Sequence, residues 1–297
     1  MKKPDVCLRT DEPLGAGVLR VAEDLIDSIT AYEEHPEQED GEYIHNIRTT
    51  IKRLRALLRL IRPAVGETFF ERENARLRGA ARRLAFARDS GVARETLKEL
   101  SISGKCEKKA AAAALAGFAG EVETLENVTQ AMSQVRQDLE QTKRNLQRLQ
   151  LAENDWGVIE AGLQDVYRQS RKRMTTAFQT WDDDAFHKWR IRVKNLYYEL
   201  QFLEPVWPKR LDKMTSRLTK LQDKIGRDHD LSVLKNLLRK TPEAFGGVER
   251  VERVIRCLEG KSQKLRCAAE PLGKKIFAEK PRRFARKLGR RWCNWRR

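Results

Sequence analysis

The sequence predicts an all-α protein, and three observations support this fold class. Long stretches consist of Ala, Leu, Arg, Lys, Glu and Gln, which all favour helices. Glycine and proline, at 17 and 9 residues, are scarcer than their average share of about 12% of a chain. No segment shows the alternation of apolar and polar residues, with β-branched enrichment, that indicates a strand.

The individual helices follow from apolar periodicity and from the residues that end them. Pro63, Pro205 and Pro242 mark helix ends, and the run from Asp182 to Asp184 is typical of a helix N-cap. On this basis we expect helices at 14–34, 43–62, 67–89, 92–100, 106–151, 155–179, 184–204, 208–227, 229–240 and 247–270.

The charge of the chain restricts its partners. The 297 residues have a net charge of +17, although the first 42 residues are acidic. Such a field attracts polyanions, namely nucleic acid, anionic lipid headgroups or inorganic phosphate chains. No apolar run reaches the roughly 18–20 residues of a membrane span, and the first residues lack the apolar region of a secretory signal. The 5 cysteines show no metal-ligand spacing, so we expect a cytoplasmic protein with reduced thiols.

An internal repeat divides the chain. A histidine, an arginine and a lysine on one helix recur in the second half at the same spacing, followed by a proline and, later, by an Arg-Asp pair. The matched residues are His45 and His187, Arg48 and Arg190, Lys52 and Lys194, Pro63 and Pro205, and Arg88 and Arg227. This order indicates a duplicated helical unit. We expect an N-terminal segment at 1–12, helical repeats at 13–152 and 153–270, and a basic tail at 271–297.

The expected helix at 43–62 carries an apolar stripe and, beside it, a basic stripe. The apolar positions recur at steps of three and four: Ile44, Ile47, Ile51, Leu54, Leu58 and Ile61. One residue after each comes a histidine or a cation: His45, Arg48, Lys52, Arg55, Arg59 and Arg62. At 100° per residue these form a continuous row, with no acidic residue from Tyr43 to Gly66 to neutralise it.

The expected helix at 208–227 repeats this design with Lys213, Arg217, Lys220, Lys224 and Arg227. A solvated basic face is the ordinary explanation of one such row. Two rows in a chain of net charge +17 favour anion binding.

The repeated pattern His-x-x-Arg-x-x-x-Lys, on a basic helix and with a later Arg-Asp, resembles the conserved histidine α-helical domain (CHAD) family. The resemblance covers about residues 10–270. It implies two pseudo-symmetric four-helix units around a basic central surface or cavity that binds inorganic polyphosphate, and association with polyphosphate granules in some members. The implied site residues are His45, Arg48, Lys52, Arg53, Arg55, Arg88, His187, Arg190, Lys194 and Arg227.

Further basic residues complete the candidate site: Arg59, Arg62, Arg78, Arg82, Arg217, Lys220 and Lys224. Asn195 and Tyr197 stand where the first repeat has Arg53 and Arg55, so we expect the second helix to bind anions more weakly. A histidine with a pKa near 6.5 adds charge beside a polyanion, or else packs as a neutral residue; both interpretations stay open.

Catalysis is not expected from this sequence. The 4 histidines are scattered, and neither an H-E-x-x-H motif nor a phosphate-binding G-x-x-x-x-G-K-[ST] loop is present. His229 and Asp230 superficially resemble a phosphohydrolase pair, but we interpret Asp230 as a helix-start residue. We therefore expect a non-enzymatic binding protein without metal or cofactor.

The basic tail mixes Lys and Arg with Phe277, Phe284, Trp292 and Trp295. Such a mixture is typical of contacts with nucleic acid or a membrane surface. Three of these aromatics also fall near one helix face, which is typical of a helix docked on the protein. Nucleic-acid binding through the tail is therefore the alternative function, and a membrane-surface role comes third.

Overall fold

The computed structural model describes residues 5–30, 40–84, 125–151, 156–240, 242–245 and 247–297. Within these ranges it contains helices and no strand, which confirms the all-α prediction. The helices are α1 (Leu14–Thr30), α2 (Asp40–Val65), α3 (Glu67–Arg83), α6 (Leu125–Gln147), α7 (Gly157–Thr180), α8 (Asp183–Phe202), η2 (Glu204–Val206), α9 (Pro208–Lys240), η3 (Pro242–Phe245), α10 (Val248–Ile276) and α11 (Pro281–Trp295). None of these helices is both long enough and apolar enough to cross a membrane.

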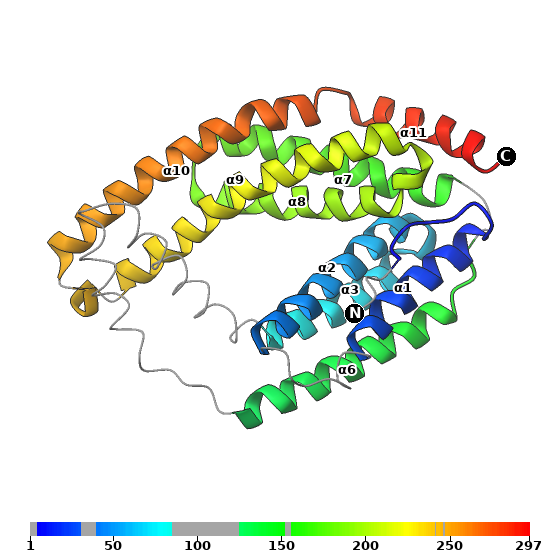
Figure 1. Cartoon of the computed structure of the whole chain (residues 1–297), viewed down its shortest axis with the longest axis horizontal. Helices are drawn as coiled ribbons and strands as arrows, with labels where there is room; N and C mark the ends of the chain where they lie inside the picture. The colour runs from blue at the N-terminus through cyan, green and yellow to red at the C-terminus, as the bar shows by residue number, and fades with distance from the viewer. Residues whose placement is uncertain (1–4, 31–39, 85–124, 152–155, 241, 246) are drawn as a thin grey trace.

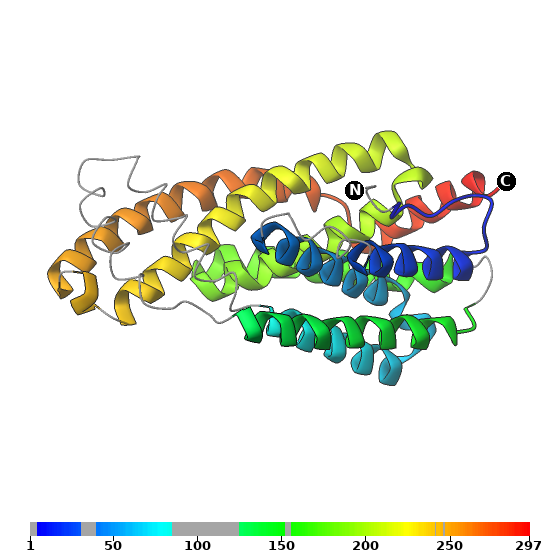
Figure 2. The same cartoon turned by 60° about the horizontal axis from the view of Figure 1, so that its bottom comes forward.

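The helices gather into two sets that follow one another along the chain (Figures 1 and 2). In the first set, α1, α2, α3 and α6 pack side by side, and in the second α8 packs on α7 and α9, while α10 packs on α9. Helix α2 also packs on α7 and α8, so it connects the two sets. The duplication inferred from the sequence stays a prediction.

Several expected boundaries differ from those observed. The two helices expected at 208–227 and 229–240 are one helix, α9, because no proline lies between Pro208 and Pro242. Helix α10 continues past residue 270 to Ile276 with Pro271 inside it, and α2 likewise contains Pro63 near its end. The expected helix at 92–100 and much of the one at 106–151 lie outside the described residues.

Helix α8 begins as the sequence predicts. The side chain of Asp182 accepts a hydrogen bond from the backbone N–H of Ala185 (2.7 Å), which satisfies one of the donors that a helix start leaves without an intrahelical partner. Helices α2 and α3 are joined by Gly66 alone, whose φ of 79° lies in the region that favours glycine.

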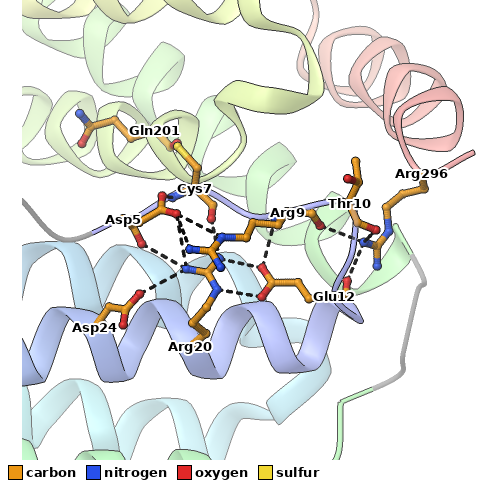
Figure 3. Close-up of polar contacts among 9 residues, drawn as sticks. All are labelled: Asp5, Cys7, Arg9, Thr10, Glu12, Arg20, Asp24, Gln201 and Arg296. Atoms are coloured by element: carbon orange, nitrogen blue, oxygen red, sulfur yellow. Dashed lines mark hydrogen bonds and ion pairs between the residues drawn. The ribbon is translucent and has the colours of Figure 1, made fainter.

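The N-terminal segment ties the first helix set to the second (Figure 3). Within it, Glu12 forms an ion pair with Arg20 of α1 (2.7 Å), and the backbone N–H of Leu8 donates to the carbonyl of Phe202 at the end of α8 (3.0 Å). Beyond the end of α11, Arg296 donates hydrogen bonds to three carbonyls of this segment, those of Arg9 (3.0 Å), Thr10 (3.0 Å) and Glu12 (2.6 Å). The carboxylates of Asp5 and Glu12 therefore pair with cations of the segment and of α1.

The basic tail forms helix α11, which docks on the body of the protein. Its apolar side chains Phe284, Leu288 and Trp292 are buried. A Cβ at Gly289 would lie 2.5 Å from Nε1 of Trp156, so the helix approaches this ring closely. The structure thus shows the tail docked on the protein through this helix. Its buried aromatic rings cannot stack on bases.

A buried ion network joins α8, α9 and α10. Arg266 of α10 is 4% exposed and contacts both carboxylate oxygens of Asp228 (3.0 and 3.1 Å). It also pairs with Asp183 at the start of α8, which in turn binds Lys235 (2.8 Å). Burial opposes ionisation of Asp183, but the hydrogen bonds from Lys235 and Arg266 outweigh it and lower its pKa to about 2.

The crossing of α2 and α7 leaves no room for a side chain. A Cβ at Gly162 of α7 would lie 2.1 Å from the carbonyl oxygen of Leu60 and 2.7 Å from that of Arg59, both on the backbone of α2. Ala56, Leu57 and Leu60 of α2 are buried as well as the expected apolar stripe. The single apolar stripe predicted for this helix was therefore incomplete.

We predict that Gly162→Ala destabilises the protein, because α2 and α7 must move apart to admit the methyl group. The expected loss is about 1–3 kcal/mol in the free energy of unfolding, measured by urea titration. Gly260→Ala in α10 is the matched control, since nothing lies within 4 Å of the position that a Cβ would take there. That change should stabilise α10 by about 0.5–1 kcal/mol. Equal effects of the two substitutions would contradict the close crossing.

We also predict that Arg266→Met costs about 3–5 kcal/mol of unfolding free energy, because it leaves the buried carboxylate of Asp228 uncompensated. Arg239→Met breaks another ion pair between α9 and α10, that with Glu259, in which both side chains are about half exposed. Its expected cost is at most about 1 kcal/mol. Thermal and urea unfolding of both variants measure this difference, and similar losses would argue against the network.

Candidate anion-binding cavity

A cavity of about 620 Å³ lies between α2 and α8, with further walls from α3 and α9. We call it the basic cavity. It is lined by Arg48, Lys52, Arg55, Arg59, Arg78, His187, Arg190, Ile191, Lys194, Asn195, Tyr198, His229, Asp230 and Val233.

Positive charge dominates this lining. Among the described lining residues, seven are Lys or Arg and one, Asp230, is acidic. Burial, together with the neighbouring Arg55, lowers the pKa of Arg59 to about 10. The pKa of Arg55 is also lowered, by burial and by Arg78 and Arg82. These arginines therefore repel one another, and a bound anion relieves that repulsion.

Hydrogen bonds hold the arginines of α2 in place. The side-chain oxygen of Asn74 in α3 accepts from Nε of Arg55 (2.9 Å) and from Nη2 of Arg59 (3.3 Å). Arg48 donates to the carbonyl of Ala81, also in α3 (3.0 Å). Since Asn74 and the carbonyl are neutral, they orient the guanidinium groups without cancelling their charge.

One buried donor in the wall lacks a protein acceptor. Asn195 of α8 is 8% exposed, and its side-chain nitrogen has no hydrogen-bond acceptor in the part of the chain that the structure describes. A buried amide without a partner costs about 1–3 kcal/mol. The nitrogen is covered by other protein atoms, so it is a cost within the wall and not a contact offered to the cavity.

Two histidines meet in the wall of the basic cavity. Nδ1 of His187 in α8 lies 3.1 Å from Nδ1 of His229 in α9, and the ring centroids are 4.4 Å apart. Burial lowers the pKa of His187, and Arg190 adds to this effect. His229 therefore belongs to the cavity, and the interpretation of Asp230 as a helix-start residue was wrong because α9 passes through this point without a break.

A neighbouring cavity of about 600 Å³ shares Arg59 with the basic cavity. Its lining mixes charges, with Arg62 and Arg192 alongside Glu67 and Asp165. Near Arg59 and Arg192, Glu199 is fully buried, and burial raises its pKa well above the ordinary value although the two arginines oppose this. The protonated form of Glu199, which burial favours, leaves the charge of Arg59 available.

The structure brings eight of the candidate residues together in the basic cavity: Arg48, Lys52, Arg55, Arg59, Arg78, His187, Arg190 and Lys194. Others lie elsewhere. Arg62 pairs with Glu67 (2.5 Å) beside the neighbouring cavity, and Arg53 lies over the ring of Tyr198. His45 and Arg82 are exposed and not part of the lining.

The basic row expected at 208–227 does not reach the cavity. Its members lie on α9 but not in the lining: Lys213, Arg217, Lys220, Lys224 and Arg227. Lys224 and Arg227 each pair with Asp223, at 3.2 Å. The geometry of this row is therefore that of a solvated basic face, which is the ordinary explanation of such a row. Arg88, another candidate residue, lies outside the described residues.

Sequence reasoning missed Asn74 and His229. The available signal for His229 was the lack of proline between residues 208 and 242, which permits one long helix carrying it to the cavity. Nothing in the sequence marks Asn74, because its role depends on how α3 packs against α2.

Comparison with known proteins agrees with this architecture. The family model for the CHAD domain matches residues 20–239. The crystal structure of the CHAD domain from the plant Ricinus communis superposes with a TM-score of 0.63 at 20% sequence identity, over 94% of this chain and 97% of that chain. Among curated proteins no match is found.

The chain belongs to the CHAD family, a class of all-helical proteins associated with polyphosphate binding. The likeness to the plant structure shows that the fold is shared.

Proposed function

We propose that this protein binds inorganic polyphosphate in the basic cavity without catalysing a reaction. The observation that carries the proposal is the lining of seven cationic side chains against a single carboxylate among the described residues, contributed mainly by α2 and α8. Guanidinium groups offer planar pairs of donors to phosphate oxygens, and lysines add mobile point charges. Membership of the CHAD family supports the same ligand.

A phosphate chain suits this lining better than a nucleic acid does. Base recognition needs open aromatic rings, and the rings in the described lining are already engaged: Tyr198 is 8% exposed with Arg53 over its ring, and His187 and His229 face each other. The aromatic rings of Phe284 and Trp292 in α11 are buried against the protein, so these two rings offer neither a stacking surface for bases nor an apolar face for a membrane. These observations favour a base-free polyanion. The same binding would place the protein on polyphosphate granules in the cytoplasm.

The test compares equal losses of charge at two places. In the cavity variant, Lys52, Arg55, Arg78 and Lys194 are replaced by Gln. In the surface variant, the exposed residues Arg282, Arg283, Arg286 and Arg290 of α11 are replaced by Gln. Both proteins lose four charges, so the field at long range changes equally, and charges beyond about 8 Å are screened at physiological salt.

We predict that the cavity variant loses at least about 100-fold in affinity for long-chain polyphosphate and the surface variant less than about tenfold. Titration at several salt concentrations, with circular dichroism to confirm retained helix, measures this. The affinity of the unmodified protein should fall log-linearly with salt, and monophosphate should bind more weakly. A larger loss in the surface variant would place the site on α11 and overturn the proposal.

We further predict that the protein does not hydrolyse what it binds. The cavity offers cations and a histidine pair, but among the residues that the structure describes no group of three His, Cys, Asp or Glu side chains is placed to hold a metal ion. Incubation with polyphosphate or nucleoside triphosphates and Mg²⁺ or Mn²⁺ should release no more phosphate than a buffer control. Release that is abolished in the cavity variant would establish an enzyme.

A further inference from the structure

The His187–His229 pair places a titratable unit in the wall of the basic cavity. A contact of 3.1 Å between two Nδ1 atoms requires that one ring donates its N–H and the other accepts with its lone pair. In the neutral pair the donating ring therefore carries its own lone pair at Nε2. This nitrogen is the place where a proton adds without breaking the contact.

The surroundings of the pair oppose that proton while the cavity is empty. The charged groups near it or sharing its cavity are Asp184, Lys188, Arg190 and Lys194 on α8, Asp230 on α9, Arg48, Lys52, Arg55 and Arg59 on α2, and Arg78 on α3. Cations outnumber carboxylates in this set. Burial and Arg190 lower the pKa of His187, and the opposing effect of Asp184 is smaller.

We propose that the His187–His229 pair takes up one proton when a phosphate chain enters the basic cavity, and so acts as a proton-linked contact for the chain. This inference rests on the proposed function. The proton comes from solvent and adds to Nε2 of the donating ring. The charged ring still donates its Nδ1–H to the neutral partner, now as a stronger charge-assisted bond. A second proton would set two N–H groups against each other, so the pair takes only one.

The direction of the pH dependence follows from this step. The anion offsets the cations that disfavour a charged imidazole, so the bound state holds more protons than the empty state. Affinity therefore rises as pH falls through the ordinary range of histidine, near 6.5. One proton limits the change to about tenfold per pH unit.

The experiment is isothermal titration of the full chain at pH 6.5 in two buffers with different ionisation enthalpies. The ligands are long-chain polyphosphate, whose terminal groups are few, and a sulfate polymer, whose charge is constant over this range. The difference in apparent enthalpy between the buffers gives the number of protons taken up. We expect about half to one proton per cavity with either ligand, and an affinity several-fold higher at pH 6 than at pH 7.5.

The double variant His187→Asn, His229→Asn keeps polar side chains of smaller size and cannot take up the proton. Its proton uptake and the pH dependence of its affinity should be lost, whatever the change in its affinity at pH 7.5. Uptake that persists in this variant, or its absence in the unmodified protein, overturns the inference and leaves polyphosphate binding standing. Absence of binding by the unmodified protein at either pH overturns the proposed function, and the inference with it. The measurement on the unmodified protein requires no variant to fold.

Discussion

The contact on which the cavity depends is the crossing of α2 and α7 at Gly162. Helix α2 carries four of the seven cations of the basic cavity, and its backbone at Arg59 and Leu60 lies directly against this glycine. The crossing lets α2 pack on both α7 and α8, so the cations of α2 and those of α8 line one cavity. A side chain at position 162 would push α2, and the cations it carries, away from α7.

The cavity keeps its positive charge because the groups that hold its arginines are neutral and the nearby carboxylates pair with other residues. Asn74 orients Arg55 and Arg59 through an amide oxygen, and burial favours the uncharged form of Glu199 near Arg59. The carboxylates of Asp183 and Asp228 are bound to Arg266 and do not line the cavity. These acidic side chains therefore join helices, and the repulsion among the lining arginines is left for an anion to relieve.

Much of this arrangement was predictable, since helix formation depends on local pattern. The stripe from Ile44 to Ile61 is buried as predicted, and the row beside it supplies Arg48, Lys52, Arg55 and Arg59 to the cavity. The matching row on α9 was predicted on equal grounds, but it lies outside the lining and pairs partly with Asp223. Periodicity shows which residues share a helix face, but not what that face meets.

The sequence by itself determined the helical class, the basic character, the repeated His-Arg-Lys pattern and the family, because these depend on composition and on spacing along one helix. Only the tertiary structure decided which row of cations forms a cavity, that Asn74 supports it and that His187 meets His229 across two helices. The physical reason is that these contacts join residues far apart in the chain. Their distances are set by helix packing, as at Gly162, and no local pattern encodes that packing.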